Sequence, residues 1–259
     1  MKIVTVVGAR PQFVKLAPVS RALKGHHEEF VVHTGQHYDD RMSESIFRDL
    51  DIRPPDLNLA VGSGTHAEQT AAAMIGIERV VAERRPDLVL IYGDTNSTLA
   101  GALVAAKSAV PLAHVEAGLR SFRKAMPEEV NRVLADHCSD LLLAPTPRAV
   151  ENLRQEGIES GVHWTGDVMF DACLAARPRA EERFPALAAG LRLQPRRYVL
   201  ATVHRAENTD SREILAGILS AFQTCGERVV LPLHPRTRKM VDAFGLWPLI
   251  EGDNVVVAE

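Results

Sequence analysis

Residues 88–98, LVLIYGDTNST, decide the fold class of this chain: a short apolar run stops at an acid, Asp94, and hydroxyl side chains follow. Residues 111–120, PLAHVEAGLR, repeat the arrangement, with Glu116 as the acid and a glycine close behind it. Apolar runs of this kind are typical of strands in a parallel sheet that helices cover on both faces. Ligands of open α/β sheets bind at the carboxyl ends of the strands. We therefore expect both acids to face one crevice.

The composition limits the class of protein. The 259 residues are 46% hydrophobic and 24% charged, which is typical of a globular chain with a sizeable core. A net charge of -3 argues against general binding to nucleic acid or to a membrane surface. Any anionic ligand must then be held by local basic groups. We therefore expect neither a nucleic-acid partner nor a membrane.

Cysteine usage and the first residues indicate the compartment. Cys138, Cys173 and Cys225 are odd in number and far apart, and no CxxC pair occurs, which favours a reducing compartment and argues against a structural zinc site. Residues 1–8 read as a strand and a glycine turn, and their apolar stretch is too short for a signal peptide. No run approaches the length of a membrane span. We expect a cytoplasmic protein.

Strand patterns and helix patterns alternate over the first 170 residues, which predicts an N-terminal Rossmann-like domain over 1–170. The predicted strands cover residues 3–7, 30–33, 88–92, 111–115 and 140–144. The predicted helices cover residues 14–23, 42–50, 68–84, 97–108, 127–138 and 147–156. Residues 51–66 hold prolines, glycines and polar side chains, so we interpret them as a long functional loop.

A second block follows a connection over residues 171–197, in which the sequence predicts only a weak helix. Its strands are predicted at 198–203, 229–233 and 255–257, and its helices at 214–224 and 236–244. Three strands are few for a parallel sheet with protected edges, and the last one ends the chain. The predicted fold class is therefore α/β with two Rossmann-like parallel-sheet domains, of which the second, over 198–259, is incomplete.

Two cations lie at the start of the first helix. Arg10 follows the first strand, and Lys15 lies one helical turn further on. The free N–H groups of a helix start and two cations together favour a phosphate or carboxylate ligand. The spacing is not the GxGxxG pattern of dinucleotide sites. The structural alternative is that Arg10 caps a turn and Lys15 is a solvated helix residue.

Three acids are candidates for proton transfer. Asp94, with Thr95 behind it, lies at a helix start, so its alternative role is that of a helix cap. Glu116 has no such capping role, which favours a functional one. Glu128 opens the helix over 127–138, where an acid also suits the helix dipole, and it lies four residues before Arg132 on the same helix face. Either of these last two side chains could position the other.

Histidines follow predicted strands at three places. His204 and Arg205 follow one strand of the second block, and His234 and Arg236 follow another. Two such pairs could clamp a diphosphate, although a single histidine is more often an ordinary surface or core residue. His37 follows the second strand and is expected at the same crevice as the acids.

Seven short motifs, taken together, resemble the non-hydrolysing UDP-N-acetylglucosamine 2-epimerase family, and they run in order along the whole chain. They are GARPQ (8–12), TGQHY (34–38), YGDTNST (92–98), HVEAGLR (114–120), PEEVNR (127–132), TGDVM (165–169) and HRAENT (204–209). The resemblance implies a two-domain fold like that of GT-B glycosyltransferases, with the active site between the domains. It also implies no metal or nicotinamide cofactor, and a homodimer.

The family's reaction is the reversible conversion of UDP-GlcNAc to UDP-ManNAc, for precursors of surface polysaccharides. A base removes the C2 proton as UDP leaves C1, and UDP then adds back to the 2-acetamidoglucal with the proton on the other face. By motif match, Asp94, Glu116 and Glu128 correspond to the acid/base carboxylates, and His204 to a histidine at the diphosphate. The resemblance and the patterns above assign substrate contacts to Arg10, Lys15, His37, Thr95, Arg120, Arg132, Arg205, His234 and Arg236.

Family members continue past the position of Glu259 with residues that grip uracil and ribose. We therefore expect this chain to be a fragment with weak UDP binding and little turnover. Two alternatives share the architecture: a glycosyltransferase, which would need an acceptor site, and a catalytically silent nucleotide-sugar binder. The clustering of three acids favours epimerisation over transfer.

Overall fold

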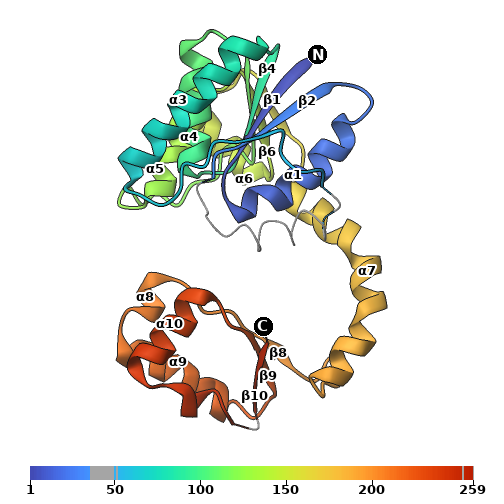
Figure 1. Ribbon diagram of the computed structural model, residues 1–259, viewed down its shortest axis with the longest axis vertical. Helices are drawn as coiled ribbons and strands as arrows, with labels where there is room; N and C mark the ends of the chain where they lie inside the picture. Colours follow the sequence, from blue (N-terminus) through green and yellow to red (C-terminus); the bar gives the residue numbers. More distant parts are fainter. Residues whose placement is uncertain (36–49, 51, 253, 259) are drawn as a thin grey trace. The chain divides into compact units, whose positions relative to one another are not determined.

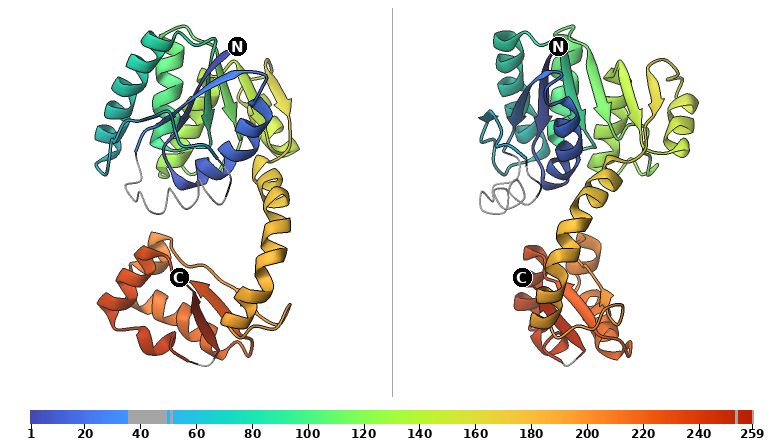
Figure 2. Two further views of the ribbon diagram at one scale, coloured as in Figure 1. Left: turned by 45° about the vertical axis from the view of Figure 1, so that its right-hand side comes forward. Right: turned by 90° about the vertical axis from the view of Figure 1, so that its right-hand side faces the viewer.

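The computed structural model describes residues 1–35, 50, 52–252 and 254–258. The chain divides into two compact units, Met1–Arg177 and Pro178–Glu259, and each is described by itself (Figures 1 and 2). The helix predicted over 42–50 and the predicted site residue His37 lie outside the described residues, apart from residue 50. The α/β class with two parallel sheets is confirmed.

A seven-stranded parallel sheet forms the centre of the first unit, in the order β3-β2-β1-β4-β5-β6-β7. The strands are β1 (Lys2–Val7), β2 (Glu28–His33), β3 (Leu57–Asn58), β4 (Leu88–Tyr92), β5 (Leu112–Val115), β6 (Leu141–Ala144) and β7 (Val162–Trp164). The predicted loop over 51–66 therefore contains a strand, β3, and β7 was not predicted. Both are edge strands of two or three residues, too short for a pattern of alternating side chains.

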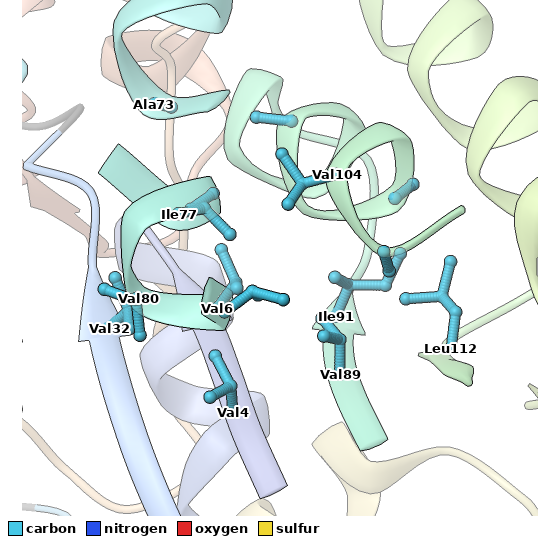
Figure 3. Packing of buried hydrophobic residues seen from close by; sticks show 14 of the residues in the cluster. Val4, Val6, Val32, Ala73, Ile77, Val80, Val89, Ile91, Val104 and Leu112 are labelled. Atoms are coloured by element: carbon cyan, nitrogen blue, oxygen red, sulfur yellow. The ribbon is translucent and has the colours of Figure 1, made fainter. Parts of the chain in front are cut away.

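Helices cover both faces of this sheet because its central strands are apolar on both sides. The helices of the unit are α1 (Arg10–Leu23), α3 (His66–Arg84), α4 (Asn96–Lys107), α5 (Pro127–Cys138) and α6 (Pro147–Gln155). Alternate residues of β1 point to opposite faces. Val4 and Val6 lie in one apolar cluster with residues of α3 and α4 (Figure 3). Ile3 and Val7 lie in a second cluster with residues of α1. Each buried Val, Leu or Ile side chain stabilises the fold by about 1.5–3 kcal/mol.

A single long helix, α7 (Val168–Gly190), runs across the boundary between the two units. The sequence predicts only a weak helix inside the connection, because Pro178 and Pro185 lower its helical propensity. The helix instead begins before the predicted connection and passes through both prolines. None of the described helices, α7 included, is both long and apolar enough to cross a membrane.

The second unit is built on a three-stranded parallel sheet in the order β10-β9-β8. Its elements are β8 (Val199–Leu200), α8 (Ala206–Thr209), α9 (Arg212–Thr224), β9 (Val229–Pro232), α10 (Pro235–Phe244), the short 3-10 helix η1 (Trp247–Leu249) and β10 (Val255–Ala258). Leu215 and Leu219 of α9 pack with Leu231 of β9 and Val241 of α10 in its core. Strand β8 is shorter than the predicted 198–203, and its edge leaves Val199 and Leu200 exposed.

The connection from β5 to α5 is held by Glu129, in the first turn of α5. Its carboxylate accepts hydrogen bonds from the backbone N–H of Ser121 and Phe122, at 2.9 Å and 2.7 Å, and from the Ser121 hydroxyl, at 2.9 Å. Burial by itself would raise the pKa of Glu129, but these hydrogen bonds and the charge of Arg132 outweigh it and lower the pKa below the ordinary value. This loop fixes where α5 begins.

The glycine at position 118 offers a test of how tightly α6 packs against the end of β5. A Cβ at Gly118 would lie 2.4 Å from the Ala149 carbonyl oxygen of α6, whereas a Cβ at Gly157 would meet nothing within 4 Å, and both glycines have positive φ. Gly157→Ala should cost only the strain of a left-handed residue, about 1–2 kcal/mol. Gly118→Ala should cost at least about 3 kcal/mol, because backbone must move as well. Thermal midpoints followed by circular dichroism measure the difference; equal midpoints for the two variants would contradict it.

The buried carboxylate of Glu129 should make the thermal stability of the chain depend on pH in the acidic range. Its pKa is lowered in the folded state, so its contribution is complete above the unfolded value of about 4.3 and is lost as pH falls through the folded pKa. Glu129→Gln should lower the thermal midpoint at neutral pH and flatten the fall of the midpoint in acid. Glu128→Gln is the matched control, because Glu128 is exposed and makes no hydrogen bond to a described residue. A Glu129→Gln profile parallel to that of the wild type between pH 3 and 7 would refute this role.

Candidate functional site

The turns that follow β1 and β4 are tied together by one buried amide side chain. The Gln12 carbonyl oxygen accepts hydrogen bonds from the backbone N–H groups of Gly8, at 2.7 Å, and Ala9, at 3.0 Å. Its amide nitrogen donates to the Tyr92 carbonyl, at 2.8 Å, and to the Thr98 hydroxyl, at 3.0 Å. Gln12 therefore sets the start of α1 beside the start of α4. The sequence offered Gln12 only as a member of the GARPQ motif.

Gly8 allows the carboxyl ends of β1 and β2 and the start of α4 to pack closely together. A Cβ on Gly8 would lie 2.0 Å from the Ser97 hydroxyl oxygen and 2.1 Å from that of Thr34, which themselves share a hydrogen bond of 2.7 Å. No side chain can occupy that position without displacing buried hydroxyls. The carboxyl ends of β1 and β2 and the start of α4 consequently form one compact edge.

Lys15 and Glu116 form a partly buried ion pair at this edge. The side chains of the pair are 10% and 17% exposed, which excludes the alternative that Lys15 is a solvated helix residue. Glu116 has a φ of 74°, a left-handed conformation that strains a residue other than glycine. A Cβ on Gly93 would lie 3.0 Å from Lys15 Nζ and 3.2 Å from Glu116 Oε2, so a side chain there would crowd the pair, and the φ of 60° at Gly93 also favours glycine. Strain of this kind is typical of functional sites.

Asp94 lies directly after Gly93 and is held by α5. Its carboxylate accepts a hydrogen bond of 2.5 Å from Arg132, and its carbonyl accepts one of 2.9 Å from the Asn131 amide. The cap of α4 is Thr95, whose hydroxyl accepts from the Thr98 N–H, so the alternative role of Asp94 as the helix cap is wrong. The Asp94 side chain is 31% exposed and open to a ligand.

Arg132 is shared between two acids, and neither is Glu128. Besides Asp94 it contacts Glu129, three residues before it, with 3.3 Å between Arg132 Nη1 and Glu129 Oε2. Glu128 is exposed at the start of the same helix and makes no hydrogen bond or ion pair with any described residue. The predicted pairing of Glu128 with Arg132 is therefore absent from the part of the chain that the structure describes. Sequence spacing could not decide between the two glutamates, because both lie within reach of Arg132 along the helix.

The two remaining cations that the sequence predicts at the site, Arg10 and Arg120, differ sharply in their surroundings. Arg10 is exposed at the start of α1 and makes no hydrogen bond or ion pair within the described ranges. Arg120 is 1% exposed and paired with Asp136, at 2.6 Å, and with Glu156, at 2.7 Å. Burial alone would lower the pKa of Arg120, but the two carboxylates raise it above its ordinary value. Its described partners are all internal, so a substrate contact by Arg120 stays a prediction.

The predicted residues of the second unit gather after β8 and β9. The rings of His204 and His234 lie with their centroids 5.3 Å apart, and His234 also caps α10 by accepting a hydrogen bond from the Arg236 N–H. The Arg236 guanidinium pairs with Asp210 at 2.6 Å and donates to the Thr209 hydroxyl at 3.0 Å. Arg205 is exposed, 3.7 Å from Glu207. The exposed imidazoles and guanidinium groups form a surface suited to an anion.

The first unit thus carries carboxylates of two kinds on adjacent strand ends. The Glu116 side chain is 17% exposed and held by Lys15, whereas the Asp94 side chain is 31% exposed and held by Arg132. Carboxylates in such different surroundings can serve as base and acid in one reaction. Glu128 adds a third carboxylate at the amino end of α5.

Known proteins share this chain's sequence and fold. The family model described as UDP-N-acetylglucosamine 2-epimerase matches residues 21–256. The chain is 51% identical to the UDP-N-acetylglucosamine 2-epimerase homolog of Methanococcus maripaludis, over 98% of this chain and 72% of that protein. It is 48% identical to the UDP-2,3-diacetamido-2,3-dideoxy-D-glucuronate 2-epimerase of Pseudomonas aeruginosa, over 95% of this chain and 70% of that protein.

A solved structure agrees with these sequence relations. The crystal structure of the UDP-GlcNAc 2-epimerase of Methanocaldococcus jannaschii, in complex with UDP-GlcNAc and UDP, has a TM-score of 0.89 and 41% sequence identity. The match covers 100% of this chain and 73% of that one. The family model, the relatives and the fold agree, and the chain belongs to the UDP-N-acetylglucosamine 2-epimerase family.

Proposed function

We propose that this chain catalyses the reversible epimerisation of UDP-GlcNAc at C2 to give UDP-ManNAc. The observation that carries the proposal is a pair of ion pairs, Lys15–Glu116 and Arg132–Asp94, whose carboxylates follow the neighbouring strands β5 and β4. These are the groups that proton removal next to a departing anion requires.

The proposed reaction conserves every atom of the substrate. A carboxylate takes the C2 proton, the C2–H electrons form a C1=C2 double bond, and the C1–O bond breaks with its electrons on UDP. The intermediate is 2-acetamidoglucal. In the return step UDP attacks C1 and a carboxylic acid protonates C2 on the opposite face. Asp94, Glu116 and Glu128 share these proton transfers, and their division among the three stays open.

The cations have two proposed tasks. Lys15 and Arg132 pair with Glu116 and Asp94 and hold these two carboxylates in place. Arg10 and Thr95 are proposed to contact the substrate, together with Arg120 and His37. In the second unit, His204, Arg205, His234 and Arg236 are proposed to bind the diphosphate.

A second substrate has support from the relatives. The chain is 48% identical to the P. aeruginosa enzyme named for UDP-2,3-diacetamido-2,3-dideoxy-D-glucuronate, against 40% and 42% for the UDP-N-acetylglucosamine 2-epimerases of M. maripaludis and M. jannaschii. The chemistry at C2 is the same for both sugars. The assembly as a homodimer, the cytoplasmic location and the supply of surface polysaccharides stay predictions.

Exchange at C2 tests the reaction directly. The purified chain is incubated in D2O with UDP-GlcNAc or with UDP-2,3-diacetamido-2,3-dideoxy-D-glucuronate. NMR should show deuterium at C2 of the UDP-sugar and formation of its 2-epimer. The UDP-sugar that exchanges faster is the preferred substrate. Perturbed UDP resonances without exchange of either sugar would indicate a silent binder and overturn the proposal. Transfer of the sugar to an added acceptor would indicate a glycosyltransferase instead.

The three carboxylates should each matter for turnover. Asp94→Asn, Glu116→Gln and Glu128→Gln should each lower the turnover number by about 10²- to 10⁴-fold, because each removes a proton-transfer group. Titration with UDP should give affinities close to that of the wild type. Glu159→Gln, which alters an exposed acid of the same unit, is the control and should retain activity. Wild-type turnover in the Asp94 and Glu116 variants would exclude them as acid and base.

A further inference from the structure

His114 lies in β5, two residues before Glu116, and its side chain is completely buried. Ring nitrogen Nδ1 lies 2.7 Å from Asp136 Oδ1, and Nε2 lies 2.8 Å from the carbonyl oxygen of Gly93. A carbonyl oxygen only accepts hydrogen bonds, and an ionised carboxylate does the same. A neutral imidazole has a single N–H, so it could satisfy only one of these contacts.

Asp136 does not supply the missing hydrogen. Its second oxygen, Oδ2, accepts hydrogen bonds from Arg120 Nη1, at 2.6 Å, and from the Gly118 N–H, at 3.0 Å. A guanidinium and a backbone N–H that both donate to one carboxylate favour its ionised form. An ionised Asp136 only accepts hydrogen bonds, so both nitrogens of His114 must donate.

The charges of the surrounding groups agree with this state. Arg120 joins two carboxylates, Asp136 and Glu156, so these three groups carry one negative charge in excess. A protonated His114 brings the buried cluster to neutrality, which is the state that a poorly solvated interior favours. His137, on α5, also faces Glu156 at 3.3 Å, but it is 47% exposed and lies at the rim.

His114 and Asp136 each hydrogen-bond to one of the two turns that carry Asp94 and Glu116. His114 holds the carbonyl of Gly93, the residue before Asp94, and the Gly93 N–H donates to the Val115 carbonyl at 3.0 Å. Asp136 holds the amide of Gly118, two residues after Glu116. Gly93 is therefore fixed at both of its backbone polar groups, and each turn depends on a partner buried behind the sheet edge.

We propose that both ring nitrogens of His114 carry hydrogens in the folded protein, one donated to Asp136 and one to the Gly93 carbonyl, and that the His114–Asp136 pair acts as a positioning device for Asp94 and Glu116. The consequence for turnover rests on the epimerase activity proposed above, whereas the protonation state does not. His114 itself touches no reacting atom.

Nitrogen-15 NMR of the ring nitrogens tests the protonation state without substrate. In the full chain at neutral pH, the His114 signal should show hydrogens on both nitrogens, protected from exchange. His114→Gln should remove that signal, and His137→Gln, which changes the exposed neighbour, should leave it unchanged. Asp136→Asn should convert His114 to the neutral ring, because it removes the countercharge. A wild-type His114 with one N–H would overturn the proposal.

Kinetics test the positioning role. His114→Gln offers one donor and one acceptor in place of two donors, so the turns should shift while the cations that bind substrate remain. We expect a kcat about 10- to 100-fold lower with little change in KM, and a His137→Gln control equal to the wild type. A protonated His114 in the NMR experiment together with wild-type kcat in His114→Gln would refute positioning. If neither UDP-sugar turns over even in the wild type, the proposed function fails and the NMR result still stands.

Discussion

Carboxylates removed from water need charged or hydrogen-bonding partners, and this requirement shapes the first unit around the carboxyl end of strand β5. On the side of α1, Glu116 pairs with Lys15, and on the side of α5, Asp136 contacts His114 and pairs with Arg120. An unpaired buried carboxylate would be far too costly to maintain, so the helices that bring the cations are part of the site. The end of strand β5 thereby carries Glu116, the proposed acid or base, next to groups that hold the strand end in place.

The backbone conformation at the ends of β4 and β5 also helps to position the Lys15–Glu116 pair. Glu116 adopts a left-handed φ that glycine would adopt more readily, and Gly93 leaves the space that the Lys15–Glu116 pair fills. The backbone hydrogen bond of 3.1 Å from the Glu116 N–H to the Leu143 carbonyl and the pair with Lys15 hold the strained glutamate in this conformation. Precise placement of this kind is what converts a group of acids into a catalytic site.

Much of the architecture could be predicted because period and composition agree. Strand β4 and helix α5 have the predicted bounds, since an apolar run bounded by charge, and a proline at a helix start, are strong local signals. Strands β3 and β7 were not predicted because strands of two or three residues are too short to show an alternation of apolar and polar side chains. Helix α7 continues through two prolines that local propensity would place at its ends, so a helix that bridges two units is not visible in the sequence.

The sequence alone determined which residue types stand at the strand ends, and through its motifs the family. Which side chains meet was decided only by the tertiary structure. Glu128 and Glu129 are equivalent by helix spacing, but the backbone N–H groups of the loop at Ser121 and Phe122 select Glu129 as the structural acid and leave Glu128 exposed. Likewise, the local sequence around Arg120 does not show which acids it pairs with. Only the folded structure brings its guanidinium to Asp136 of α5 and to Glu156 at the end of α6. The physical reason is that hydrogen bonds and ion pairs between distant segments depend on distances that no local pattern contains.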